Sequence, residues 1–137
     1  MSEYMLMVYE EEVDPAEQAE REQVTPMLVE LHASLREAGL LVGVHRLYST
    51  ESATSVRVRG GETEITDGPF AVTKEVLAGY YVLECADLDE ALRHAQRLPM
   101  APWATIEVRP VMAAAEWLDT ARRAGVALAD EDVGNLG

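Results

Sequence analysis

The residues best suited to chemistry lie in one loop, residues 66–70. Asp67 supplies a carboxylate, and Phe70 supplies an aromatic ring. Gly68 and Pro69 make the loop a stiff turn, because glycine accepts a positive φ and proline fixes its own φ. Such a loop fits the wall of a substrate cleft. It equally fits an ordinary turn in which Asp67 caps nearby backbone N–H groups.

Asp67 is the candidate proton acceptor of a cofactor-free acid–base reaction, provided that it lies within hydrogen-bond reach of a substrate proton. His45 could assist it, because the side chain lies opposite Val44 on an expected strand and so could point into a barrel interior. It could equally bond a neighbouring strand or lie exposed. Tyr80 and Tyr81 point to opposite faces of their strand, so one hydroxyl faces such an interior and needs a partner or a ligand. The candidate catalytic residues are Asp67, His45 and Tyr80.

Two cations near these residues could hold an acidic ligand. Lys74 could place its ammonium near a substrate carboxylate, or form a surface ion pair with Glu75. Arg109 could bind an anion, or pair with Glu107 on the same face of its strand. The candidate ligand-binding residues are therefore Gly68, Pro69, Phe70, Lys74 and Arg109.

The remaining reactive side chains do not suggest a metal or a cofactor. His32, His45 and His94 include no closely spaced pair of ligands, so we predict no metal site. His32 is expected to be packed or at the surface, and His94 to face solvent. No nucleotide-binding glycine loop or nucleophile motif is present, so we predict no cofactor. Cys85, the single cysteine, is expected to be a small buried side chain.

The charge of the chain limits its partners. Eleven Lys and Arg against 25 Asp and Glu give a net charge of −14, which would repel phosphate groups. We therefore expect no nucleic-acid partner and no anionic membrane partner. No apolar run approaches the roughly 20 residues that cross a bilayer, and the start of the chain lacks a basic flank typical of secretion signals. The single cysteine agrees with a reducing, cytoplasmic location.

The periodicity of apolar residues predicts the elements that position these side chains. A helical segment over 15–38 should break or kink at Pro26, Asp87 should cap a second helix over 87–98, and a short helix should follow over 113–124. Gly60 and Gly61 should make a tight hairpin. The expected strands cover residues 4–9, 40–48, 54–59, 62–66, 76–85 and 105–110.

The order of these elements predicts an α+β fold of the ferredoxin-like type. We expect residues 1–112 to form one domain, and residues 113–137 to form an appended helix and a mobile acidic tail. The first and fifth strands are apolar on both alternating faces, although two helices can cover only one face of the sheet. A two-fold homodimer that joins the second faces would give a dimeric α+β barrel.

Several motifs in the same order resemble the DGPF group of the YCII-related superfamily. They include Asp67-Gly68-Pro69-Phe70, Thr73-Lys74-Glu75, Gly79-Tyr80-Tyr81 and Asp87-Leu88-Asp89-Glu90-Ala91. The resemblance implies the dimeric α+β barrel. It also implies a bacterial protein, since similar members accompany alternative sigma factors. A His/Asp pair is thought to be catalytic in YCII-like relatives, but residues 24–27 of this chain hold no histidine at the corresponding place. Asp67 is the carboxylate that the motif supports.

These observations leave two functional hypotheses. In the first, the protein binds a small organic molecule in a cleft beside the Asp67–Phe70 loop, with cofactor-free acid–base catalysis. In the second, it is a dimeric regulatory or adaptor module without enzymatic activity, linked to sigma-factor signalling or the stress response. The second hypothesis rests on the acidic charge and on the apolar segment around Trp117.

Overall fold

The computed structural model describes residues 1–129, and an antiparallel four-stranded sheet forms its centre. Neighbouring strands follow the order β2-β5-β1-β6, and their bounds are β1 (Ser2–Glu11), β2 (Leu41–Arg46), β5 (Glu75–Cys85) and β6 (Thr105–Pro110). Both β5 and β6 run antiparallel to β1, which lies between them. This is the split β-α-β arrangement of ferredoxin-like folds. The predicted α+β class is confirmed, and the sheet of one chain is open rather than closed into a barrel.

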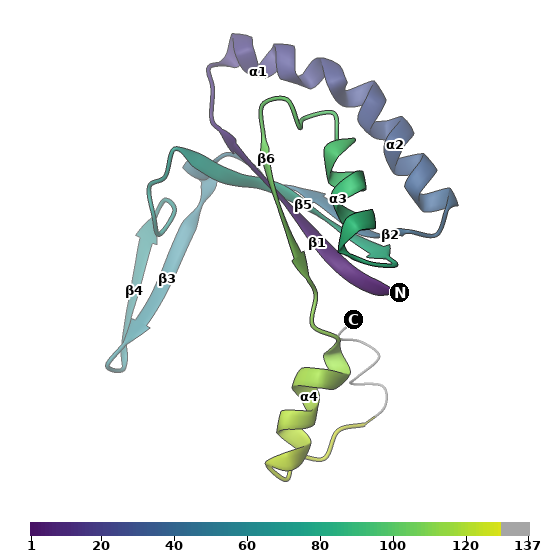
Figure 1. Ribbon diagram of the computed structural model, residues 1–137. Coiled ribbons are helices and arrows are strands. Elements are labelled where there is room, and N and C mark those ends of the chain that lie inside the picture. Colours follow the sequence, from purple (N-terminus) through teal and green to yellow (C-terminus); the bar gives the residue numbers. More distant parts are fainter. Residues whose placement is uncertain (130–137) are drawn as a thin grey trace.

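The helices begin and end close to the predicted residues. They are α1 (Pro15–Arg21), α2 (Thr25–Glu37), α3 (Leu88–Gln96) and α4 (Ala114–Arg123). The predicted break near Pro26 is confirmed. A 3₁₀ turn, η1 (Glu22–Val24), separates α1 from α2, and Pro26 lies in the first turn of α2, where its missing N–H removes no helical hydrogen bond. Figure 1 shows α1, α2 and α3 together on one side of the sheet.

The core lies between the sheet and the helices α2 and α3. Leu6 of β1 and Leu83 of β5 are fully buried, and Tyr81 is only 4% exposed. Cys85 is buried as predicted, and burial raises the pKa of its thiol, which therefore stays protonated at neutral pH. The helices contribute Leu35, Ala91 and Ala95 to the same cluster.

The second face of the sheet carries apolar side chains that α1, α2 and α3 do not cover. Met5 pairs with Val82 and Met7 pairs with Tyr80 across β1 and β5. These four residues are half-buried, and they alternate along the strands with fully buried neighbours. The prediction that both strands are apolar on two faces is therefore confirmed. We call this surface the open face.

Strands β3 (Thr54–Arg59) and β4 (Glu62–Asp67) form a separate hairpin, here called the arm, after a 3₁₀ turn, η2 (Thr50–Ser52). Gly60 and Gly61, with φ of 59° and 81°, make the predicted tight turn. Figure 1 shows the arm projecting from the body, away from α1, α2 and α3. The arm pairs with no strand of the main sheet, and both of its faces are exposed.

The chain leaves the sheet for α4 at residue 111. The N–H of Val111 donates to the carbonyl oxygen of Glu3 at 2.9 Å, which extends the β1–β6 pairing by one bond. Beyond it, α4 stands apart from the sheet (Figure 1). The acidic run 130–132 lies outside the described residues. Within residues 1–129, no helix is both long and apolar enough to span a membrane.

Candidate functional site

A cleft of about 420 Å³ lies between the first helical segments and the sheet. Its lining comes from the end of β1, from α1, η1 and α2, from the region where β2 and β5 pair, and from Trp103. A volume of this size falls in the range of about 300–1,000 Å³ that is common for small-molecule sites. The cleft is therefore large enough for a small organic ligand.

His32 of α2 and Tyr81 of β5 meet inside this cleft. The Nε2 atom of His32 lies 2.8 Å from the Tyr81 hydroxyl, and the two rings contact edge to face with centroids 5.3 Å apart. His32 is half-buried, and Tyr81 is buried except at the cleft. In the tautomer that carries its proton on Nδ1, the imidazole accepts the hydrogen bond from the phenol.

The surroundings keep both groups uncharged at neutral pH. Burial lowers the pKa of His32 below its ordinary value, and the nearby positive charge of Arg36 lowers it further. Burial raises the pKa of Tyr81, an effect that the positive charge of Arg46 partly offsets. A neutral imidazole beside a protonated phenol can accept a proton and can donate one, which are the two roles that acid–base chemistry needs.

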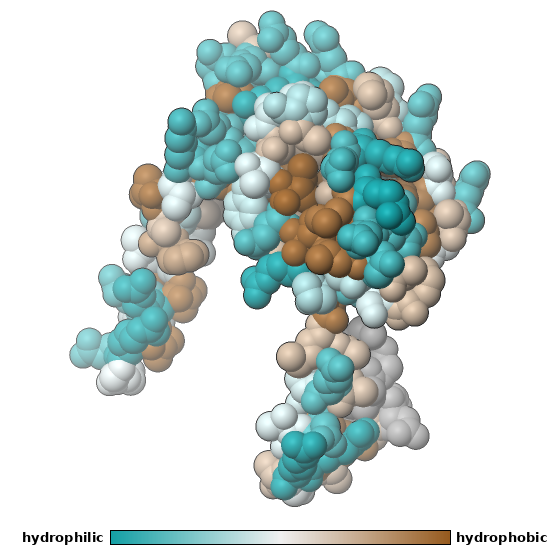
Figure 2. Space-filling model, viewed as in Figure 1, coloured by the Kyte–Doolittle hydropathy of each residue, from teal (hydrophilic) through white to brown (hydrophobic). Residues whose placement is uncertain are grey.

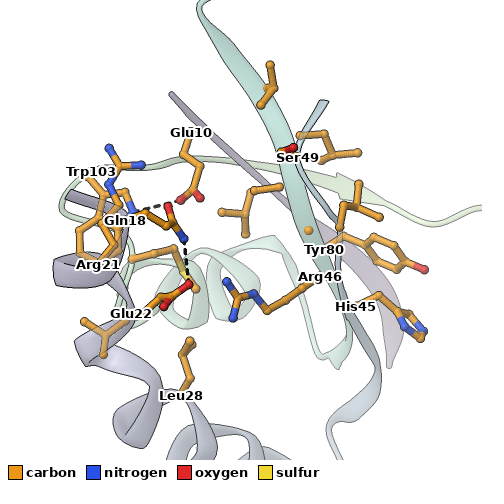
Figure 3. Close-up of a pocket in the computed structure, with 18 of the residues that line it drawn as sticks. Glu10, Gln18, Arg21, Glu22, Leu28, His45, Arg46, Ser49, Tyr80 and Trp103 are labelled. Carbon is orange, nitrogen blue, oxygen red and sulfur yellow. Dashed lines mark hydrogen bonds between the residues drawn. The ribbon is translucent and has the colours of Figure 1, made fainter. Parts of the chain in front are cut away.

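Carboxylates surround the mouth of the cleft, and each is held by a neighbour. Glu10 accepts a hydrogen bond from the indole N–H of Trp103 at 3.0 Å (dashed in Figure 3). Glu22 accepts one from the side-chain amide of Gln18 at 3.4 Å. The Oε1 of Glu11 lies 3.1 Å from Nζ of Lys74, and Glu12 accepts from the backbone and the hydroxyl of Thr50.

The two arginines of the cleft differ in the interactions that their side chains make. Arg21 donates to the carbonyl oxygen of Glu11 at 2.8 Å, and its guanidinium lies 5.6 Å from the ring centroid of Trp103. Arg46 extends into the cleft toward Glu22 in Figure 3. Within residues 1–129, the side chain of Arg46, an exposed residue, makes no hydrogen bond and no ion pair. It is therefore the cation of the cleft that remains available to a ligand.

His45 and Tyr80, two of the predicted site residues, do lie together. They are register partners on β2 and β5, and their ring centroids are 5.5 Å apart. Both residues are part of the lining of the cleft, and Figure 3 shows their side chains on the far side of the strands from Arg46. They belong to the open face, opposite to the face that carries Tyr81.

Asp67 does not join either group. It ends β4 opposite Thr54 in the arm, and it is exposed. The interpretation of Asp67 as a cap is wrong, because its carboxylate accepts no hydrogen bond from the described residues. The turn is held instead by Gly68, whose N–H donates to the carbonyl of Ala53 at 2.7 Å, and by Ser55, whose hydroxyl donates to the carbonyl of Gly68 at 2.8 Å.

The other predicted ligand-binding residues lie near the surface. Pro69 and Lys74 line a second depression of about 240 Å³, and Phe70 is 85% exposed. The ion-pair partner of Lys74 is Glu11 rather than Glu75. Arg109 pairs in register with Met5 on the open face, and within the described chain it makes no ion pair with Glu107.

No motif or spacing in the sequence indicated the His32–Tyr81 pair or Arg46. One signal was available for His32, which follows Leu28 by four residues and precedes Leu35 by three, on the inward face of α2. His94 was wrongly expected to face solvent. Its side chain is 16% exposed and its Nε2 lies 3.7 Å from Glu90 Oε1, because this side of α3 packs toward the sheet.

Comparison with known proteins identifies the family. The YCII-related domain family matches residues 2–129. An uncharacterised protein of Rhizobium meliloti (strain 1021) is 46% identical over 94 residues, which cover 67% of this chain and 76% of that protein. The family match, over residues 2–129, includes every strand and helix of the structure. The chain therefore belongs to the YCII-related family.

Proposed function

We propose that this protein binds a small organic acid in the cleft beneath α1 and α2, and that His32 and Tyr81 exchange protons with it without a cofactor. The observation that carries this proposal is Arg46. It is a cation inside the cleft that lacks a partner among the described residues, and its charge is felt by the Tyr81 hydroxyl. A bound carboxylate would supply the missing partner.

The charge distribution of the cleft supports an anionic group at this point. The chain as a whole is strongly acidic, so an anion needs a local cation to enter. Each carboxylate at the mouth already interacts with a donor or a cation, which reduces its effect on a ligand. A charge-assisted hydrogen bond to an arginine contributes about 1.5–3 kcal/mol, enough to fix the orientation of a small acid.

Binding can be measured through Trp103, which lines the cleft. A Trp117→Phe background removes the second tryptophan, so quenching of the remaining fluorescence reports on the cleft. The probes are benzoate and pyruvate, with benzyl alcohol as an uncharged control. We expect saturable binding of the acids, weakened about tenfold or more by Arg46→Gln. Arg97→Gln, a matched loss of charge at the C-cap of α3 and outside the cleft, should leave the binding unchanged. Equal binding by the Arg46 variant would refute the proposal.

Proton transfer needs a separate measurement. Pyruvate carries both a carboxylate for Arg46 and an acidic methyl C–H, so its exchange of hydrogen for deuterium in D₂O can be followed by proton NMR. We expect the protein to speed this exchange above the buffer rate, and we expect His32→Gln to lose the effect while still binding pyruvate. Exchange at the buffer rate in the unmodified protein would limit the function to binding.

A site beside the Asp67–Phe70 loop stays a separate prediction. Asp67 lies outside both depressions, which favours the cleft over this loop as the ligand site. The variant Asp67→Asn separates the two. Unchanged binding and unchanged exchange would agree with the cleft, whereas their loss with retained folding would assign the site to the loop.

We also propose that the protein is a homodimer joined through the open face. Met5, Met7, Tyr80 and Val82 form an apolar surface there that the helices leave uncovered, and two such faces would close the barrel that the family resemblance implies. Sedimentation equilibrium should give twice the mass of 15.1 kDa at micromolar concentration. A single subunit at all concentrations would exclude this assembly. The regulatory or adaptor role remains a prediction from charge.

A further inference from the structure

The arm has two chemically different faces. On one face, Arg57 lies opposite Glu64 and Arg59 lies opposite Glu62, so the charges are balanced across the strands. On the other face, Val56 lies opposite Ile65, and the next position of β3 on this face is also a valine, Val58. The hairpin is therefore amphipathic, although it contacts no layer of its own chain.

The apolar face of the arm is open to water. Val56 is 66% exposed, Val58 is 55% exposed and Ile65 is 67% exposed. The hydrophobic patches along the arm are visible in Figure 2. A two-stranded hairpin is at best marginally stable alone in water, and it needs packing against another element. The arm thus carries a strip of apolar surface that is not covered by the described residues of its own chain.

The position of the arm points to what covers it. The arm leaves the body where β2 and β5 pair, next to the open face, and the bond from the N–H of Leu47 to the carbonyl of Ala78 at 2.8 Å continues that pairing toward it. Figures 1 and 2 show the arm and α4 as two projections on the side away from α1, α2 and α3, with a gap between them. A body placed against the open face would lie beside the arm.

The size of the open face supports the same conclusion. The sheet has four strands, and β1 and β6 share a register of six residue pairs. At about 4.8 Å between strands and about 3.4 Å per residue, this face has a footprint of roughly 400 Å². A stable interface commonly buries about 800 Å² on each partner. A second contact would bring the interface up to this size.

The charge of the arm is compatible with a second copy of this chain as the occupant. The chain carries −14 overall, so two copies repel each other except where the acidic charge is diluted. The arm is such a place, since Arg57 and Arg59 lie opposite Glu64 and Glu62, and Asp67, at the base of the apolar face, is the one further carboxylate of residues 54–67. The arm therefore repels a second copy less than the rest of this acidic chain does.

We propose that the arm packs its apolar face, formed by Val56, Val58 and Ile65, against the partner copy and clasps the dimer from outside the open face. This inference rests on the homodimer proposed above. Each copy contributes one arm, so the two-fold symmetry doubles the added contact. It also carries the Asp67–Phe70 loop to the boundary between the two copies.

The test compares dimer dissociation constants by sedimentation. Val58→Glu places a charge on the apolar face and should raise the dissociation constant at least tenfold. Thr66→Glu adds the same charge on the opposite face of the arm, where Thr66 lies opposite Ser55, and should change it less than twofold. Met7→Glu on the open face should also dissociate the dimer, because it disrupts the main interface.

The outcomes separate the arm from the dimer itself. A dimer that is broken by Met7→Glu but not by Val58→Glu overturns the clasp and leaves the homodimer standing. An unmodified protein that is monomeric overturns both, although ligand binding in the cleft is independent of this result. The rate of backbone amide hydrogen exchange in residues 54–67 tests the same contact in the unmodified protein. Exchange should slow at least tenfold above the dimer dissociation constant, and equally fast exchange above and below it would show that a second copy does not cover the arm.

Discussion

His32 Nε2 lies 2.8 Å from the Tyr81 hydroxyl, so a side chain of α2 and a side chain of β5 are joined across the cleft. The bond links the helical layer to the middle of the sheet at the point where the layers part to form the cavity. The His32–Tyr81 hydrogen bond therefore has two roles. It holds α2 on the sheet, and it positions a proton donor beside a proton acceptor.

Tyr81→Phe should reduce the free energy of unfolding by about 1 kcal/mol, because half-buried His32 loses its partner. Urea unfolding followed by circular dichroism measures the change. Tyr80→Phe is the matched control. The Tyr80 hydroxyl has no hydrogen bond to the described residues, so its removal should change the stability by less than about 0.5 kcal/mol. Equal losses in the two variants would mean that the His32–Tyr81 bond contributes no stability.

The stability of the protein should decrease in acid because of His32. Its pKa is lowered in the folded state, mainly by burial, while the unfolded chain titrates near 6.5. Below this pH the unfolded chain binds more protons than the folded one. The free energy of unfolding therefore decreases as the pH is lowered, until the pH is below the pKa of His32 in the folded state. The contribution is fully present above about pH 7. His32→Gln should weaken the pH dependence of the free energy of unfolding between neutral pH and pH 5, measured by urea unfolding. An unchanged dependence would mean that other groups cause it.

Gly79→Ala should destabilise the fold by about 1–3 kcal/mol. A Cβ at this position would lie 2.6 Å from the carbonyl oxygen of His45 and 3.3 Å from the Cα of Arg46, both of which are backbone atoms of β2 and cannot move alone. Gly43→Ala is the control, since a Cβ there meets no atom within 4 Å. Thermal unfolding should show a lower midpoint for the first variant, and a similar midpoint for both would contradict the predicted clash.

Asp87→Ala should cost about 1 kcal/mol through the start of α3. Asp87 Oδ1 accepts a hydrogen bond from the N–H of Glu90 at 2.9 Å, and the Glu90 side chain accepts one from the N–H of Ala86. Asp89→Ala removes a carboxylate from the same first turn without removing the cap, and should cost only a few tenths of a kcal/mol. Chemical unfolding of both variants makes the comparison, and a larger effect at Asp89 would show that charge outweighs capping.

Local signals in the sequence were sufficient for most of the elements. Gly60-Gly61 required a tight turn, Pro26 required an interruption of the first predicted helix, and Asp87 was suited to cap the second. Each depends on the conformational preference of one or two residues, so no distant contact was needed to predict it. The order of elements and the two-sided apolar strands then fixed the α+β class and indicated an uncovered sheet face.

The faces of individual side chains were less predictable. The apolar pattern predicts an uninterrupted strand over 40–48, but in the structure the register shifts between Leu41 and Gly43. An extra residue in one strand reverses the direction of the side chains on one side of it. Leu41 and Val44 consequently both pack on the helical face, whereas Val42 is 53% exposed.

The sequence by itself determined the secondary structure, the α+β class, the YCII-related resemblance and the excess of apolar sheet surface. Only the tertiary structure decided that His32 meets Tyr81 across 49 positions of the chain, that Arg46 shares their cleft, and that Asp67 stands apart on the arm. The physical reason is that turns and caps are set by neighbouring residues. A site, in contrast, is set by strand register and by which helix packs over which strand.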